Sequence, residues 1–410
     1  PLAAVATLGF CAYLALYPAC AGWLQARAPG PDWLRAALLA PAAWTLLEWM
    51  RGWMLTGFPW LAMGYAAIDT PLAGYAPVGG VYLLSFAALA CAGLVWCFAR
   101  GHGRAQTAVA LGLIVAGGAA LQTVRWTAPL GVVTHVALLQ GNVPQALKFD
   151  PARYAGTLET YAGLAARSRA RLIVLPETAL PRFLDLVDPA YLARLEAVGR
   201  RNDGDLLVGV PLRDAAGRYT NSVITLGASP RQAYHKVHLV PFGEFVPPGF
   251  GWVMRWLSLP LSDFSRGAPD QPLIEVAGQR VAVNVCYEDV FGAEIARALP
   301  RATLLVNVSN VAWFGDSLAP AQHLQIARMR AIETGRMVLT ATNTGITAAI
   351  AADGSVVGKL PQFTQGQLQL GALAYGGATP FVRLGNGLVL ALAALALAVA
   401  GLVARAYRSR

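Results

Sequence analysis

Three polar residues that each follow an apolar run could together catalyse acyl transfer. Glu177 ends the run LIVLPE, Cys286 ends VAVNVC, and Lys236 lies in YHKVHLVPFGEF. A cysteine thiolate is a strong nucleophile whose pKa falls near a cation or a helix N-terminus. A carboxylate can accept the thiol proton, and an ammonium can stabilise a tetrahedral oxyanion. The combination therefore predicts acyl transfer through a covalent thioester.

Lysine is rare in this chain, which makes Lys236 informative. The sequence contains 29 arginines and only three lysines, Lys148, Lys236 and Lys359. Arginine is thus used wherever a positive charge alone suffices, and Lys236 indicates a need for a compact donor with a tunable pKa. Taken singly, a buried cysteine, a surface glutamate and a solvated lysine are each more often structural. Only the combination favours catalysis.

Cys286 stands apart from the other cysteines. Cys11, Cys20, Cys91 and Cys97 lie in long apolar runs, where cysteine is a small hydrophobic residue. Cys286 is the only cysteine outside these runs. In an oxidising compartment such a lone thiol is either buried and inert or present for its reactivity. The sequence leaves both possibilities open for Cys286.

Competing chemistries find less support in the sequence. It contains no Walker A, GxGxxG, GxSxG or HExxH motif. His235 and His238 are three residues apart but have no obvious third ligand, so a zinc site is not favoured. We therefore expect neither a metal nor a cofactor.

The distribution of charge indicates what positions these residues. Of 410 residues, 56% are hydrophobic and 13% charged, whereas a soluble domain carries about 25% charged residues. A single soluble domain and a disordered chain are both excluded. Residues 1–131 hold nine charges and 384–410 only three, so most of the charge lies in residues 132–383. The chain thus divides into transmembrane helices (1–126), a water-facing catalytic domain (127–382), and a last transmembrane helix with a basic tail (383–410).

Four uncharged runs are long enough to cross about 30 Å of hydrocarbon. These runs are residues 1–26, 70–99, 105–124 and 384–404. A fifth candidate, 32–55, contains Glu48 and Arg51, which either pair with each other at helical spacing or contact lipid headgroups. Because the chain starts with proline inside an apolar run, we expect it to be incomplete at its N-terminus.

The arginines predict the orientation. The short loop 100–104 and the tail 405–410 are both basic and, by the number of intervening spans, lie on the same side, which is the cytoplasm. The central domain is then on the outer face. The net charge of +10 is therefore largely a topology signal, and nucleic acid is not expected as a partner.

Apolar runs and helical patterns alternate within the central domain, which indicates a layered α/β fold with catalytic groups at strand ends. Strands are expected near 132–140, 172–176, 205–210, 219–226, on both sides of Gly278, and at 303–308 and 337–342. Helices are expected near 151–170 and 189–201, from about Phe291, and near 320–334.

Four motifs are characteristic in combination: LPETALP, HKVHLVPFGEFVP, NVCYEDVF and SNVAWFGDSLAPAQHLQIARMRAIETGR. They resemble the carbon-nitrogen hydrolase (nitrilase) superfamily and, over nearly the whole chain, its membrane-embedded apolipoprotein N-acyltransferases. The resemblance implies a nitrilase-like αββα sandwich inserted between transmembrane helices of a bacterial inner membrane and exposed to the periplasm. It also implies further spans before the first residue. By motif position, Glu177 is the base, Lys236 the oxyanion stabiliser and Cys286 the nucleophile.

The resemblance also implies substrates and supporting residues. The acyl donor would be a membrane phospholipid, and the acceptor the N-terminal amine of a diacylglyceryl-cysteine on an apolipoprotein. Glu244, Tyr287 and Glu288 would support the triad. Two departures stand out, Val311 where aspartate is usual and Phe149 where tryptophan is expected, and they concern the neighbouring loop and the acyl-chain contact.

Several aromatic and polar residues are candidates for substrate contact. Residues 242–264 contain six aromatic residues, including Trp252 and Trp256. This segment is interpreted as a lid at the membrane interface, and an ordinary loop packed on its own domain is the alternative. Phe149, Asn310 and Trp313 complete the candidate substrate contacts.

Two other functions remain open from the sequence. A membrane-tethered amidase or nitrilase would use the same triad with water as the acceptor. A receptor or scaffold would use the domain only to bind lipoproteins, but the presence of all three triad residues makes this less favoured.

Overall fold

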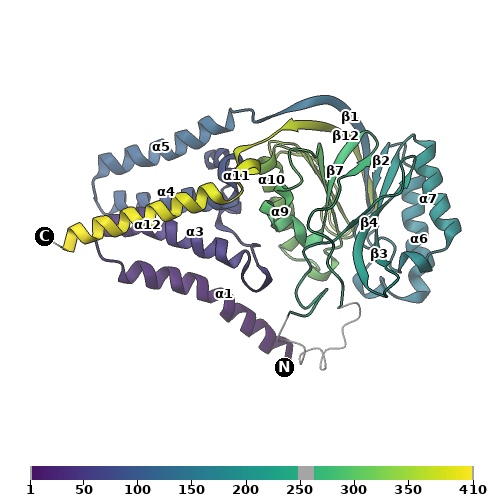
Figure 1. Ribbon diagram of the computed structural model, residues 1–410, viewed down its shortest axis with the longest axis horizontal. Helices are drawn as coiled ribbons and strands as arrows, with labels where there is room; N and C mark the ends of the chain where they lie inside the picture. Colours follow the sequence, from purple (N-terminus) through teal and green to yellow (C-terminus); the bar gives the residue numbers. More distant parts are fainter. Residues whose placement is uncertain (1, 248–262, 409–410) are drawn as a thin grey trace. The chain divides into compact units, whose positions relative to one another are not determined.

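The computed structural model describes residues 2–247 and 263–408, and the chain divides into two compact units. The first unit comprises residues 1–126 and 379–410, and the second comprises residues 127–378. Figure 1 shows the helical first unit and the α/β second unit.

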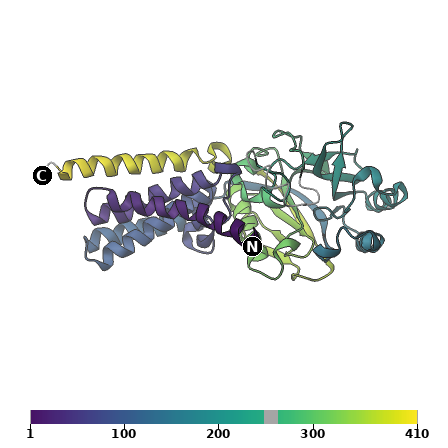
Figure 2. The ribbon, with the colours of Figure 1, turned by 90° about the horizontal axis from the view of Figure 1, so that it is seen from below.

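The first unit is a bundle of helices. A continuous helix runs from Asp32 to Arg51 through α2, η1 and α3, and Figures 1 and 2 show α12 running beside α3 and α4, which it contacts. The elements are α1 (Leu2–Arg27), α2 (Asp32–Leu34), η1 (Arg35–Leu39), α3 (Ala40–Arg51), η2 (Met54–Thr56), η3 (Met63–Ala67), η4 (Pro71–Tyr75), α4 (Ala76–Ala99), α5 (Arg104–Gln122), α11 (Pro380–Leu384) and α12 (Gly387–Arg408).

Four helical segments of the described chain are long and apolar enough to cross a membrane. They are Ala4–Arg27, Pro71–Ala99, Arg104–Gln122 and Gly387–Ala406. These segments agree with the four uncharged runs of the sequence, and the chain is a membrane protein.

The fifth candidate span ends in a paired charge. Glu48 and Arg51 approach to 3.8 Å. Glu48 also accepts hydrogen bonds from the Met63 N–H, at 2.7 Å, and from the Ser85 hydroxyl. Protein groups therefore satisfy this carboxylate, which agrees with the self-paired alternative.

The second unit contains two sheets, each six-stranded over the residues described. Their orders are β12-β1-β2-β3-β4-β5 and β11-β10-β9-β8-β7-β6. Within them β1, β2 and β3 are parallel, as are β7, β8 and β9. The strands are β1 (Thr127–Gln140), β2 (Leu172–Val174), β3 (Asp205–Arg213), β4 (Tyr219–Gly227), β5 (Ala233–His235), β6 (Ile274–Val276), β7 (Gln279–Val285), β8 (Leu304–Ser309), β9 (Val338–Thr342), β10 (Ala348–Ile350), β11 (Val356–Lys359) and β12 (Gly366–Gly377).

Helices cover the outer face of each sheet. Helices α6 (Pro151–Ala166) and α7 (Pro189–Arg201) pack on the first sheet, and α10 (Ala319–Thr334) packs on the second beside the short α9 (Gly292–Ala296). Figure 1 shows these two pairs on opposite sides of the strands. Short turns η5 (Gln145–Leu147), η6 (Leu184–Leu186), η7 (Cys286–Val290) and η8 (Ala312–Phe314) complete the unit. The expected αββα sandwich is confirmed.

The alternation of side chains along β1 explains the two-layered core. Val136 and Leu138 are fully buried between the two sheets, whereas Ala137 and Leu139 are buried in the core beneath α6 and α7. Because successive residues of a strand face opposite sides, a strand buried on both faces needs an uninterrupted apolar run. Burial of this apolar surface is the main force that holds the sheets and helices together.

The sequence patterns missed four strands, β5, β10, β11 and β12. Strands β5 and β10 have only three residues each, and β12 (GQLQLGALAYGG) is rich in glycine, which is unfavourable in strands. Pairing with neighbouring strands holds them in place, and a single sequence does not display such pairing.

Candidate active site

The candidate catalytic residues lie directly after strands. Cys286 follows β7 at once, Lys236 follows β5, and Glu177 comes three residues after β2. Asn310 likewise follows β8. The strand ends therefore bring together residues far apart in sequence, as in other layered α/β folds.

A glycine in β3 allows the Glu177 segment to pack closely. A Cβ atom on Gly209 would lie 2.3 Å from the Pro176 carbonyl oxygen and 2.8 Å from the Glu177 Cα. Backbone at this distance cannot move aside without shifting the carboxylate. Gly209 thus helps to fix the position of Glu177.

Lys236 joins two carboxylates. Its Nζ lies 2.8 Å from Glu244 Oε2 and 3.6 Å from Glu177 Oε1. The Lys236 side chain is 1% exposed, and those of both glutamates are largely buried. In such surroundings the ion pairs are weakly screened, so the three groups form one electrostatic unit.

Two asparagines fix the Glu177 carboxylate. The Asn221 amide in β4 donates to Glu177 Oε1 at 2.7 Å and to Glu244 Oε1 at 2.8 Å. The Asn310 backbone N–H donates to Glu177 Oε2 at 2.9 Å. Both oxygens of Glu177 therefore have defined donors, and the carboxylate has one orientation.

Cys286 begins the turn η7 in a strained conformation. Its φ of +54° lies in the left-handed region, which non-glycine residues seldom adopt. Glu288 stabilises this turn by accepting the Val285 N–H at 2.7 Å. The same carboxylate accepts the Val237 and His238 N–H groups, at 2.7 and 3.0 Å. Glu288 thereby ties the backbone that follows Lys236 to the backbone that precedes Cys286.

Burial and charge set the protonation states of the candidate triad. Burial opposes the charge of Glu177, but Lys236, Lys148 and the two amide donors outweigh it and hold its pKa below the usual value. Burial also opposes the charge of Lys236, but the two glutamates raise its pKa. Burial, reinforced by Glu177, raises the pKa of the Cys286 thiol well above its usual value, against the opposing effect of Lys236.

These directions correct one expectation from the sequence. A nearby cation was expected to lower the thiol pKa, but burial and the carboxylates outweigh Lys236. The resting site therefore contains a neutral thiol and an ionised glutamate. Such a pair suits a base that removes the proton during the attack, because no thiolate exists beforehand.

The supporting residues have distinct environments. Burial raises the pKa of Glu288 to about 7, although its backbone donors lower it. The Tyr234 hydroxyl also donates to Glu288, at 3.0 and 3.1 Å from its two oxygens. Tyr287 is buried, and its ring makes an edge contact with Phe291 at a centroid distance of 5.2 Å. Tyr287, within η7, therefore packs against the residue that follows this turn.

The candidate substrate contacts differ in exposure. Phe149 is 44% exposed and Trp313 is 74% exposed, so both can meet a ligand. Asn310 is buried, and its side chain bonds to other protein groups. Trp252 and Trp256 lie outside the described residues.

Val311, where the sequence departs from the family motif, leaves the neighbouring hydrogen bonds in place. It is buried with a φ of +39°, an unfavourable conformation for a β-branched residue. The Asn310 side chain still donates to Gln145 at 2.6 Å and accepts from Asn343 at 2.9 Å.

Sequence reasoning missed several polar residues of the site. Asn221 lies in an apolar strand, and the only signal was a polar residue at a buried strand position. Asp289 and His323 form a buried pair with 3.0 Å between Oδ2 and Nε2. Lys148 donates to the Glu177 carbonyl oxygen at 3.1 Å. Each of these four residues makes contact with a residue that is distant in sequence. No local sequence pattern shows such a contact.

The two histidines near Lys236 have separate partners. His235 Nδ1 lies 2.9 Å from the Ser222 hydroxyl, and His238 Nδ1 lies 3.1 Å from Glu294 Oε1. Among the described residues no group of three His, Cys, Asp or Glu side chains could hold a metal ion.

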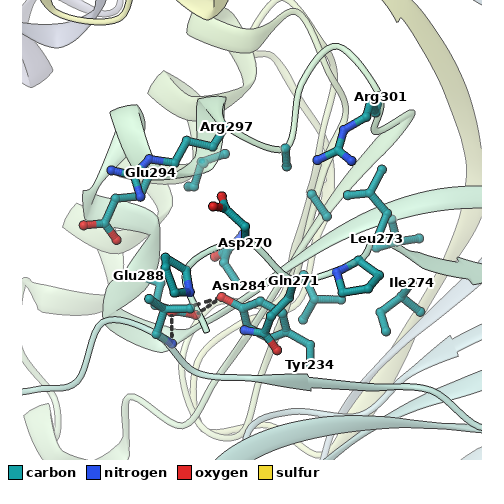
Figure 3. Close-up of a pocket in the computed structure, with 18 residues that line it drawn as sticks. Tyr234, Asp270, Gln271, Leu273, Ile274, Asn284, Glu288, Glu294, Arg297 and Arg301 are labelled. Carbon is teal, nitrogen blue, oxygen red and sulfur yellow. Dashed lines mark hydrogen bonds between the residues drawn. The ribbon is translucent and has the colours of Figure 1, made fainter. Parts of the chain in front are cut away.

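A pocket of about 90 Å³ lies on one side of Glu288. Figure 3 shows Tyr234, Asn284 and Glu288 on one side of it, and Arg297 and Arg301 across from them. Neither Glu177, Lys236 nor Cys286 lines this pocket. It is therefore separate from the candidate triad.

Comparisons with known proteins identify the family to which the sequence is similar. Residues 135–377 match the carbon-nitrogen hydrolase family, and residues 1–94 match the N-terminal domain of apolipoprotein N-acyltransferase. The apolipoprotein N-acyltransferase of Nitrosomonas europaea is 48% identical over 100% of this chain and 83% of its own length. That of Chromobacterium violaceum is 46% identical over 92% and 74%, respectively.

Among solved structures, a CN-hydrolase superfamily protein from Xanthomonas campestris is 19% identical, covers 59% of this chain and 91% of its own, and has a TM-score of 0.45. The sequence relatives and family matches confirm the resemblance carried by the motifs. The chain belongs to the apolipoprotein N-acyltransferase family, whose catalytic domain is a carbon-nitrogen hydrolase fold.

Proposed function

We propose that this acyltransferase moves an acyl chain from a membrane phospholipid to the N-terminal amine of a diacylglyceryl-cysteine, through a thioester on Cys286. The observation that carries the proposal is the buried contact of Lys236 with Glu177 and Glu244. A ping-pong acyl transfer needs a nucleophile, a base and a group that stabilises the oxyanion. Here Cys286, which begins a strained turn, supplies the thiol, Glu177 the ionised base and Lys236 the ammonium.

In the first half-reaction the Cys286 sulfur attacks the ester carbonyl carbon of the phospholipid. Glu177 takes the thiol proton, and Lys236 stabilises the oxyanion. The carbon–oxygen bond of the ester then breaks, and Glu177 returns the proton to the departing glycerol oxygen. A lysophospholipid leaves, and the acyl chain stays on sulfur.

In the second half-reaction the acceptor amine attacks the thioester carbonyl. Glu177 takes a proton from the attacking nitrogen, the carbon–sulfur bond breaks, and the proton passes to the sulfur. The products are an amide and the free thiol, so the enzyme is regenerated. Exclusion of water preserves the thioester between the two steps.

Exposed aromatic side chains support a lipid substrate. Phe149 directly follows Lys148, and Trp313 lies three residues after Asn310, so both adjoin segments that contact Glu177. We assign these two residues to contact with the acyl chain. The helices that can cross a membrane would anchor the catalytic domain to the same membrane as both lipid-anchored substrates.

The basic loop 100–104 and the basic tail 405–410 support a cytoplasmic location for these two segments. In a bacterial inner membrane the catalytic unit would then face the periplasm. Accessibility of single introduced cysteines to a membrane-impermeant reagent tests this orientation.

The decisive assay uses the full chain in proteoliposomes with a phospholipid labelled in its acyl chain and a synthetic diacylated lipopeptide. We expect the label to appear as an amide on the lipopeptide, with no transfer by Cys286→Ala. Release of free fatty acid in place of the amide would indicate a hydrolase. Lipopeptide binding without any turnover would indicate a scaffold.

A further inference from the structure

We propose that Lys148 is a positioning residue of this site, a second buried cation that balances the two carboxylates around Lys236 and keeps Glu177 ionised. This role rests on the proposed function in so far as Glu177 is the base. Lys148 is one of only three lysines in the chain.

The Lys148 segment is bound to the Glu177 loop from two sides. Lys148 directly follows η5, is 4% exposed, and donates from Nζ to the Glu177 main-chain oxygen at 3.1 Å. Gln145, in the same turn, accepts a hydrogen bond from the Asn310 side chain at 2.6 Å. Asn310 in turn donates its backbone N–H to Glu177 Oε2. The lysine is therefore fixed beside the base.

The charges of the cluster do not balance without Lys148. One ammonium, Lys236, faces two carboxylates, Glu177 at 3.6 Å and Glu244 at 2.8 Å. With a neutral thiol this group carries one excess negative charge, which is costly inside a protein unless it is compensated. Lys148, which lies in the segment between β1 and α6, supplies the compensating positive charge.

The pKa shifts of Lys148 and Glu177 agree with the role of Lys148 as a compensating cation. Burial lowers the pKa of Lys148 to about 8, and the charges of Glu177 and Cys286 oppose this effect. A pKa of about 8 leaves most of the Lys148 side chains protonated at pH 7. In return Lys148 helps to lower the pKa of Glu177.

Other groups also act on Glu177 and must be considered in its titration. Lys236 and the donors Asn221 and Asn310 favour its charged form. The Cys286 thiol and, from α10, His323 interact with it electrostatically. A change at Lys148 leaves these groups in place, so any shift in titration reports on Lys148.

The first test is a pH profile. The rate at which a soluble p-nitrophenyl ester acylates Cys286 is measured for the full chain in detergent, as wild type, Lys148→Met, Lys148→Arg and Lys359→Met. Because loss of a nearby cation raises a carboxyl pKa, we expect Lys148→Met to move the acidic limb upward by about one pH unit. Lys148→Arg should keep the wild-type limb, and so should Lys359→Met, which removes an exposed lysine.

An acidic limb that is unchanged in Lys148→Met would overturn the inference. Failure of the proposed function gives a different result, since wild-type protein would then show no acylation that depends on Glu177. The two failures are thus distinguishable.

The second test separates charge from structure by a double-mutant cycle of thermal unfolding. Lys148 bonds to the backbone oxygen of residue 177, which Glu177→Gln retains. We therefore expect Lys148→Met to lower the Tm less in the Glu177→Gln background than in the wild type. Equal decreases would mean that Lys148 is only a structural donor. Should Lys148→Met fail to fold, recovery of folding in the double variant supports charge balance, and failure of the double variant contradicts it.

Discussion

The Lys236 ammonium lies 2.8 Å from a Glu244 carboxylate oxygen, closer than the 3.6 Å that separates it from Glu177. The same Glu244 oxygen accepts the Val240 N–H at 2.8 Å, so this carboxylate is itself fixed. Glu244 therefore holds the lysine, and the longer contact leaves Glu177 available as a base. These distances thus give two similar carboxylates different roles.

Lys236→Arg is expected to reduce acyl transfer nearly as much as Lys236→Ala. The planar guanidinium is larger than the ammonium and cannot occupy the same point between the carboxylates and the oxyanion. We expect a loss of roughly 10²- to 10³-fold in kcat, measured with labelled phospholipid and lipopeptide. Lys359→Arg, at an exposed position, is the matched control. Near-wild-type activity of Lys236→Arg would reduce Lys236 to a counter-charge.

Asn221→Asp is expected to be more harmful than Asn221→Ala, although aspartate has nearly the same shape. The Asn221 amide donates to both Glu177 and Glu244, and a third carboxylate there would repel both. We expect a loss of about 3 kcal/mol of stability, as for an unpaired buried charge, and a raised pKa of Glu177. Thermal unfolding and the pH dependence of acylation measure these effects. The explanation fails if aspartate is tolerated as well as alanine.

His323 should make stability depend on pH. Burial disfavours its charge, but Asp289 at 3.0 Å and a hydrogen bond with the Cys286 backbone raise its pKa above the usual value. A histidine whose folded pKa is raised stabilises the protein fully below the unfolded pKa of about 6.5 and loses this contribution as the pH rises through the folded pKa. The Tm of the wild type should therefore fall, relative to that of His323→Asn, as the pH rises from about 6.5 through the raised folded pKa of His323.

The exposed His102 provides the control for this measurement. His102→Asn should follow the wild-type curve. Parallel curves for the wild type and His323→Asn would show that the buried pair does not exchange a proton on folding.

A covalent intermediate should accumulate when the acceptor is withheld. With phospholipid alone, one acyl chain is expected on Cys286, because a site poor in water leaves the thioester unreacted. Intact-protein mass spectrometry should detect the added mass, and hydroxylamine or a diacylated lipopeptide should remove it. Cys286→Ser should trap little or none, since a hydroxyl is far harder to deprotonate than a thiol. An unmodified wild-type mass combined with normal transfer would instead mean direct transfer without an acyl-enzyme.

Local patterns in the sequence were sufficient for most of the fold. Uncharged runs of about 20 residues predict membrane helices because of the thickness of the bilayer. Likewise, the apolar run around Val136 to Leu139 predicts a strand buried on both faces, because strand side chains alternate. The three-residue strands β5 and β10 escaped prediction because pairing with neighbouring strands holds them in place.

The sequence by itself determined which residues could do the chemistry, since the single cysteine of the central domain, a rare lysine and a glutamate that each follow an apolar run can be read from it. Only the tertiary structure decided the protonation states of these residues. It brings Asn221 and Lys148 to Glu177 across 44 and 29 residues of chain. It also buries Cys286, and this burial, reinforced by Glu177, raises the pKa of the thiol. Burial and the distances between charges set a pKa, and both arise when separate strands meet.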